Sequence, residues 1–100
     1  MARDTTTCVQ QEVEVINPLG MHARPAATLV RVANGFPCDV LVERDGRRAN
    51  AKSVMSLLTL AASCGTRLRV ICDGEGAPEA LAAVTNLFHR GFDELDGEQA

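Results

Sequence analysis

The sequence predicts a small two-layer α/β sandwich with one face of its sheet open to water. Three observations predict this fold. The chain has 100 residues, of which 46% are hydrophobic, and this is enough for one buried core. Several short segments alternate apolar and polar residues, as half-buried strands do. Amphipathic segments with helical spacing lie between them, so the expected order is β-α-β-β-α-β-α.

The first strand and the first helix flank a polar loop. Valine alternates with glutamate along residues 11–16, which predicts a strand. Residues 23–34 carry apolar side chains at helical spacing, and this predicts a helix. Pro25 falls in its first turn, where a missing N–H group leaves no hydrogen bond unmade. Gly35 follows as a stop signal.

A hairpin and a second helix come next. Strands are expected over residues 40–44 and 47–50, because Asp45 and Gly46 between them form a strong hairpin signal. A helix is expected over residues 53–62, with Ser53 as its N-cap and Gly65 closing it.

The last two elements are a strand over residues 67–72 and a helix over residues 78–92, opened by Pro78. Together these elements predict one domain spanning residues 1–100, with its core over about 10–94 and loose ends on both sides. The tail after Glu94 is acidic and is expected to be loose.

Composition excludes several classes of function. Ten basic residues against thirteen acidic ones give a net charge of −3, and only three residues are aromatic. Both features disfavour a nucleic acid or an anionic membrane as partner. No apolar run approaches the ~18 residues of a membrane span. The first eight residues lack the apolar stretch of a secretory signal, so a cytoplasmic location is expected.

The four cysteines, at positions 8, 38, 64 and 72, form no C-x-x-C pair. They are expected to be reduced thiols rather than metal ligands, and no metal site is predicted. Cys38 and Cys72 lie in strand-like sequence, where burial as small apolar side chains is expected. His89 is expected to be a solvated surface residue.

The start of the first predicted helix concentrates the chemistry. A helix N-terminus binds anions through its unpaired N–H groups, here those of Ala23 and Arg24. His22 stands at that end, and an ordinary imidazole is mostly neutral and nucleophilic at cellular pH. The Arg24 guanidinium can hold a phosphate. These residues alone leave two interpretations open: a site for a covalently held phosphoryl group, or a surface histidine without a role.

Two motifs carry a family resemblance. Residues 17–27, NPLGMHARPAA, resemble the active-site signature of HPr, the histidine phosphocarrier family of the bacterial phosphotransferase system. Residues 49–55, ANAKSVM, resemble the second signature of that family. Gly65 and the helix sequence at residues 79–84 also fit, so the resemblance covers residues 10–94, and the predicted element order is that of the family.

The resemblance implies an α+β fold, an open-faced sandwich in which three helices cover one face of a four-stranded antiparallel sheet. It implies that His22 accepts a phosphoryl group on Nδ1 from the phosphoenolpyruvate-dependent enzyme I and passes it to an enzyme IIA, with assistance from Arg24. The protein would be a carrier without cofactor rather than an enzyme. Ser53 matches the regulatory serine that an HPr kinase phosphorylates in some bacteria, although it also has a structural role as an N-cap.

The second helix predicts a docking surface. Its phase places some apolar side chains off the core-facing side, and in the family this region neighbours the active histidine. The residues predicted to dock partners are Ala27, Arg31, Val54, Met55 and Leu58. A monomer is expected.

Two further interpretations stay open. Residues 35–36, 56–60 and 86–94 resemble the nitrogen-related branch, NPr, more than the sugar-uptake branch. An alternative function is a non-catalytic regulatory module that binds an enzyme or transcription factor through Ser53 and the surface of Val54 and Met55. HPr-like paralogues of that kind typically lack the histidine, which argues against it as the sole role.

Overall fold

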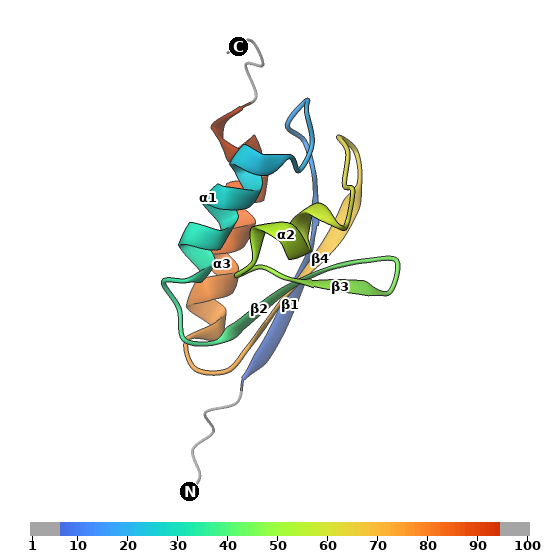
Figure 1. Cartoon of the computed structure of the whole chain (residues 1–100). Helices are drawn as coiled ribbons and strands as arrows, with labels where there is room; N and C mark the ends of the chain where they lie inside the picture. Colours follow the sequence, from blue (N-terminus) through green and yellow to red (C-terminus); the bar gives the residue numbers. More distant parts are fainter. Residues whose placement is uncertain (1–6, 95–100) are drawn as a thin grey trace, which may run out of the picture.

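The computed structural model of the protein describes residues 7–94 and forms one four-stranded antiparallel sheet (Figure 1). Its strands are β1 (Cys8–Glu14), β2 (Asp39–Arg44), β3 (Arg47–Asn50) and β4 (Arg67–Asp73). Their order across the sheet is β1-β4-β2-β3. The strand that comes last in the chain therefore separates the first two.

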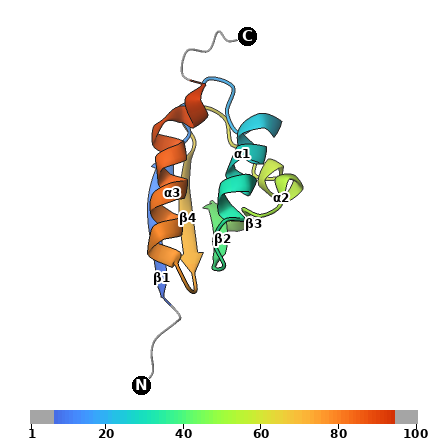
Figure 2. The same cartoon turned by 90° about the vertical axis from the view of Figure 1, so that its left-hand side faces the viewer.

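Three helices lie on one face of this sheet (Figure 2): α1 (Ala23–Ala33), α2 (Val54–Leu58) and α3 (Ala77–His89). A short 3-10 turn, η1 (Gly91–Asp93), follows α3. The core lies between the helices and the sheet and is mostly aliphatic, with Leu29, Leu57, Val70 and Phe88 fully buried. The predicted α+β fold is confirmed. No helix in residues 7–94 is both long enough and apolar enough to cross a bilayer.

Strand register explains why one sheet face stays open to water. Val42 pairs with Val70 on one side and with Ala49 on the other, and all three are buried beneath the helices. One residue along, opposite charges alternate across all four strands, because side chains on adjacent strand positions point to opposite faces. That outer row is Glu12, Arg69, Glu43 and Arg48.

The second helix is shorter than the sequence predicts. It ends at Leu58, not at residue 62, and Gly65 does not close it. Arg44 of β2 donates hydrogen bonds to the carbonyl oxygens of Leu60 and Ala61, at 2.8 and 2.9 Å. Ala61 also takes a left-handed backbone with φ of 50°. The last carbonyl groups of the helix, from Ser56 to Leu58, accept the backbone N–H groups three residues ahead, so the chain tightens into turns after Leu58. The Arg44 side chain satisfies the carbonyl groups that follow these turns.

The first strand and the last helix also differ from prediction. β1 begins three residues earlier than expected, because Cys8 to Gln10 pair with the far end of β4. α3 ends at His89 instead of residue 92. Phe92 adopts φ of 54°, which turns the chain and brings its ring against that of Phe88, with centroids 5.0 Å apart. This turn sets the position of Glu94.

Candidate functional site

His22 stands at the junction between a tight loop and α1. It is the N-cap residue of the helix, with an extended backbone, and its carbonyl oxygen accepts the Ala26 N–H at 3.1 Å. The loop before it is closed by a hydrogen bond from the Gly20 N–H to the Asn17 carbonyl, at 3.0 Å. Met21 N–H donates to the Ala62 carbonyl at 2.8 Å, which ties the loop to the segment before β4.

Gly20 is the residue that permits this loop. Its φ is +73°, a region that side chains with a Cβ rarely adopt. A Cβ at this position would lie 2.7 Å from the Ala62 carbonyl oxygen and 2.9 Å from the Ser63 Cα. Both are backbone atoms, so a side chain would push the two segments apart and move the N-terminus of α1.

The His22 ring is held from one side. Its Nε2 lies 3.2 Å from Oε1 of Glu94, and the exposed fractions of the two side chains are 37% and 16%. A carboxylate only accepts hydrogen bonds, so Nε2 carries the hydrogen. In the neutral ring, Nδ1 then carries the lone pair. Nδ1 has no hydrogen-bond partner among residues 7–94.

The N-terminus of α1 offers donors beside that ring. In the part of the chain that the structure describes, no backbone carbonyl accepts the N–H groups of Ala23 and Arg24. Pro25, the third helical residue, has no N–H to offer. Arg24 is exposed and carries the positive charge at this end of the helix. An anion beside His22 would therefore meet two backbone donors, a guanidinium and the positive end of the helix dipole.

Two residues of the site were not found by sequence reasoning. The sequence places Glu94 at the edge of an acidic tail and Asn17 in a polar loop, at the start of the signature over residues 17–27, without indicating a contact between them. In the structure Asn17 is fully buried, and its Nδ2 donates to the Gly20 carbonyl at 2.8 Å and to Glu94 Oε1 at 3.2 Å. No spacing signal could reveal the pairing of Glu94 with His22, because 72 positions separate them.

Ser53 occupies the N-cap position that the sequence predicts. Its hydroxyl oxygen accepts the Ser56 N–H at 3.1 Å, and the side chain is half-buried.

The residues of the predicted docking surface are exposed to different degrees. α1 and α2 lie side by side (Figures 1 and 2), and Ala27 and Arg31 are exposed on α1. Met55 on α2 is 73% exposed, which is unusual for a large apolar side chain. Val54 and Leu58 are half-buried and pack partly against the core, so the apolar patch is narrower than the sequence predicts.

The remaining polar candidates lie outside this arrangement. Cys38 and Cys72 are buried, as predicted, and burial together with the neighbouring Cys38 thiol raises the pKa of Cys72 to about 12. No group of three or more histidine, cysteine or acidic side chains within residues 7–94 is placed to hold a metal ion. His89 is exposed, as expected.

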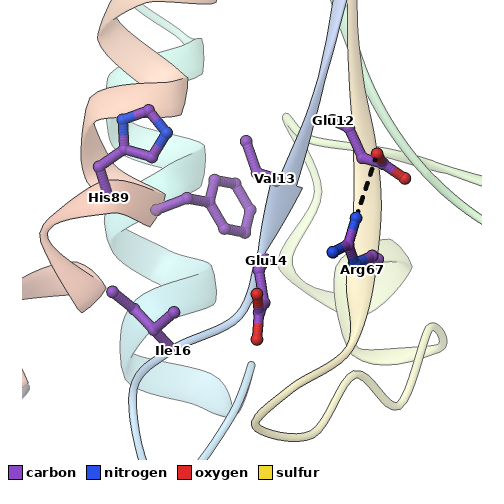
Figure 3. Close-up of a pocket in the computed structure, with 7 residues that line it drawn as sticks. Glu12, Val13, Glu14, Ile16, Arg67 and His89 are labelled. Carbon is purple, nitrogen blue, oxygen red and sulfur yellow. Dashed lines mark hydrogen bonds and ion pairs between the residues drawn. The ribbon is translucent and has the colours of Figure 1, made fainter.

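A hollow of about 460 Å³ lies at the edge of the sheet between β1 and α3 (Figure 3). Glu12 and Arg67 form an ion pair of 3.5 Å across part of it. The hollow contains none of the predicted site residues. The residues that line it and are labelled in Figure 3 are Glu12, Val13, Glu14, Ile16, Arg67 and His89.

Comparison with known proteins decides the family. Residues 9–90 match the protein family described as "PTS HPr component phosphorylation site". The chain belongs to the HPr family. This confirms the resemblance drawn from residues 17–27 and 49–55. HPr-family proteins are phosphocarriers of the phosphotransferase system and not enzymes in their own right.

HPr relatives of several kinds match over most of the chain. Phosphocarrier protein NPr of Escherichia coli K12 is 48% identical over 86% of this chain and 97% of its own length. Phosphocarrier protein HPr of Treponema pallidum is 41% identical over 86% of this chain and 98% of its own length. HPr-like protein Crh of Bacillus subtilis is 52% identical over 73% of this chain and 86% of its own length. Because all three kinds match, the branch of the HPr family to which the chain belongs stays a prediction.

Solved HPr structures share the fold. HPr-C-His from Thermoanaerobacter tengcongensis superimposes with a TM-score of 0.83 at 35% identity, covering 86% of this chain and 97% of that one. An HPr from the same organism has also been solved as a dimer, with a TM-score of 0.68 and 36% identity over 80% of this chain and 92% of that one. The expected monomer therefore stays a prediction for this HPr protein.

Proposed function

We propose that this protein is a phosphocarrier that takes a phosphoryl group on Nδ1 of His22 from enzyme I and passes it to an enzyme IIA in the cytoplasm. One observation carries the proposal: the His22 ring stands at the N-terminus of α1 with Nε2 engaged by Glu94 and Nδ1 left as the nucleophile.

The chemistry of each transfer is a displacement at phosphorus. The Nδ1 lone pair of His22 forms a bond to phosphorus as the bond between phosphorus and the donor protein breaks. The hydrogen on Nε2 stays in place, hydrogen-bonded to Glu94, so the ring needs no proton transfer to react. The onward transfer reverses these events, with a nucleophile of the acceptor attacking the same phosphorus.

Charge around His22 suits a phosphoryl group that is stored briefly. The group brings close to two negative charges, which Arg24 and the Ala23 and Arg24 N–H groups are placed to offset. The helix dipole adds about 0.3–1 kcal/mol near the surface. Because the hydrogen stays on Nε2, the phosphorylated ring carries a positive charge, and the Glu94 carboxylate faces that charge at 3.2 Å from Nε2. These contacts lie near the protein surface, so the net stabilisation is modest, which suits a group that is handed on.

Partners are proposed to dock across α1 and α2. Met55 supplies an exposed apolar contact, and Arg31 supplies a positive charge on the neighbouring helix. Ala27, Val54 and Leu58 complete this docking surface. Phosphorylation of Ser53 by an HPr kinase would add about two negative charges beside Val54 and Met55, and so would weaken docking.

The test is phosphorylation by purified enzyme I and phosphoenolpyruvate, followed by intact mass. We expect the gain of one acid-labile phosphoryl group, with a ³¹P signal typical of Nδ1-phosphohistidine. His22→Ala should abolish the gain. His89→Ala is the matched control, because it removes the other histidine, and it should leave the gain unchanged. A folded wild-type protein that gains no phosphoryl group would refute the proposal.

The similarity to Crh supports one alternative, a regulatory module acting through Ser53 and the docking surface. This alternative expects no transfer through His22, stable phosphorylation of Ser53 by an HPr kinase, and a partner that binds only the Ser53-phosphorylated form. A Ser53→Ala variant that still carries phosphoryl groups at the wild-type rate would favour the carrier.

A further inference from the structure

We infer that Asn17 is a positioning residue that orients the His22 ring and fixes its hydrogen on Nε2, acting through Glu94 and Gly20. The effect of this orientation on phosphoryl transfer rests on the proposed function. The orientation itself is a property of the unphosphorylated protein.

The Asn17 amide anchors both parts of His22. Its Nδ2 donates to Glu94 Oε1 at 3.2 Å, and that same oxygen accepts the His22 Nε2–H at 3.2 Å. Its Nδ2 also donates to the Gly20 carbonyl at 2.8 Å, and that carbonyl accepts the His22 backbone N–H at 3.0 Å. One side chain thus fixes the acceptor for the imidazole ring and the acceptor for the backbone of the same residue.

The orientation of this amide follows from its partners. Both contacts of Nδ2 are to oxygen atoms that only accept hydrogen bonds, a carbonyl and a carboxylate. A flipped amide would face these two oxygens with a third oxygen. Both Nδ2 hydrogens are therefore committed, one to each acceptor.

The other half of the amide points to a role beyond stability. Oδ1 of Asn17 is buried and has no hydrogen-bond partner among residues 7–94. A buried polar atom left without a partner destabilises a fold, and such atoms are uncommon. An asparagine at this fully buried position therefore lowers the stability of the fold, unless its two Nδ2–H donors make contacts that the protein requires.

The consequence for His22 is a fixed tautomer. Glu94 follows a 3-10 turn near the end of the described chain, and its carboxylate could rotate away from the ring. The donor from Asn17 holds Oε1 in place. With Oε1 held, the Nε2–H form is favoured and Nδ1 stays available to attack phosphorus.

The tautomer can be measured directly in the unphosphorylated protein by the ¹⁵N shifts of the His22 ring. We expect the Nε2–H form to dominate at a pH where the ring is neutral. Asn17→Ala should shift the ring toward an ordinary mixture of tautomers and slow phosphorylation by enzyme I about two- to fivefold, the scale of one part-exposed hydrogen bond to a charged group.

Asn17→Asp separates positioning from packing. It keeps the shape of the side chain but replaces the donor with a carboxylate oxygen facing Glu94, so it should release Glu94 and shift the tautomer in the same direction. A residue that only fills space would leave the tautomer of Asn17→Asp as in the wild type. Thr85→Ala is the matched control: it removes another buried side-chain hydrogen bond, to the Ala82 carbonyl, and should not move the His22 shifts.

A third measurement keeps the wild-type Asn17. In Glu94→Gln, the side-chain amide protons of Asn17 should shift, because one of them loses a carboxylate acceptor. Unchanged amide protons in that variant would overturn the inference, and so would an unchanged His22 tautomer in both folded Asn17 variants. A wild-type protein with the Nε2–H tautomer that enzyme I cannot phosphorylate would instead refute the proposed function and leave the role of Asn17 intact.

Discussion

Replacing Gly20 with alanine tests the loop that positions His22. The substitution forces a Cβ into a backbone with φ of +73°, 2.7 Å from the Ala62 carbonyl oxygen. A left-handed backbone costs a residue with a Cβ about 1–2 kcal/mol. Overpacking against fixed backbone adds about 1–3 kcal/mol. The expected loss of about 2–5 kcal/mol is a large part of the ~5–15 kcal/mol that stabilises a small domain.

Gly46 provides the matched control. It also has a positive φ, of +84°, but no atom lies within 4 Å of the position that its Cβ would take. Gly46→Ala should therefore show the backbone cost alone, about 1–2 kcal/mol. The difference between the two variants isolates the close approach of Gly20 to Ala62 and Ser63.

The assay is unfolding in urea followed by circular dichroism, because the chain has no Trp or Tyr for fluorescence. The midpoint of Gly20→Ala should fall below that of Gly46→Ala by on the order of 1 M, at an unchanged slope. Its phosphorylation by enzyme I should also slow, since Gly20 carries the carbonyl that holds the His22 backbone. Equal midpoints for the two variants would refute the reasoning from close packing.

Three further predictions concern other parts of the molecule. Arg24→Ala should slow phosphoryl transfer about three- to tenfold at an unchanged unfolding midpoint, and equal kinetics would remove Arg24 from the site. Ser53→Ala should lower the free energy of unfolding by about 0.5–2 kcal/mol through loss of the hydrogen bond from the Ser56 N–H, measured in urea. Burial raises the pKa of the Cys72 thiol from 9.0 to about 12, so the unfolded chain releases its proton first as the pH rises. The contribution of this thiol to stability should be complete below pH 9 and be lost between about pH 9 and 12, and a Cys72→Ala variant should lack that part of the decline.

Elements defined by local signals were predicted well. The strand at residues 47–50 was found with its predicted bounds, because the Asp45 and Gly46 turn fixes the register of the hairpin. The helix at residues 23–33 also begins where predicted, because the constraint that Pro25 imposes is local.

Elements and side chains whose positions depend on residues far away in the sequence were predicted less well. The turns after α2 are held by the Arg44 guanidinium of β2, and this partner has no signature in the sequence near residue 58. The His22 site was located by its position at a helix start and by family resemblance. Its two supporting residues, Asn17 and Glu94, were missed because their roles arise only when η1 is folded against the loop after β1.

The position of β4 within the sheet has a consequence for synthesis on the ribosome. β1 is hydrogen-bonded to no strand but β4 within residues 7–94, and β2 also depends on β4 for one of its two neighbours. A nascent chain that has exposed only the hairpin of β2 and β3 therefore carries β1 as an unpaired strand segment. The sheet closes only after Asp73 has left the ribosomal tunnel, and the contact of His22 with Glu94 forms later still. Until then the unpaired strands leave the chain vulnerable to aggregation and to proteases, and His22 lacks its contact with Glu94.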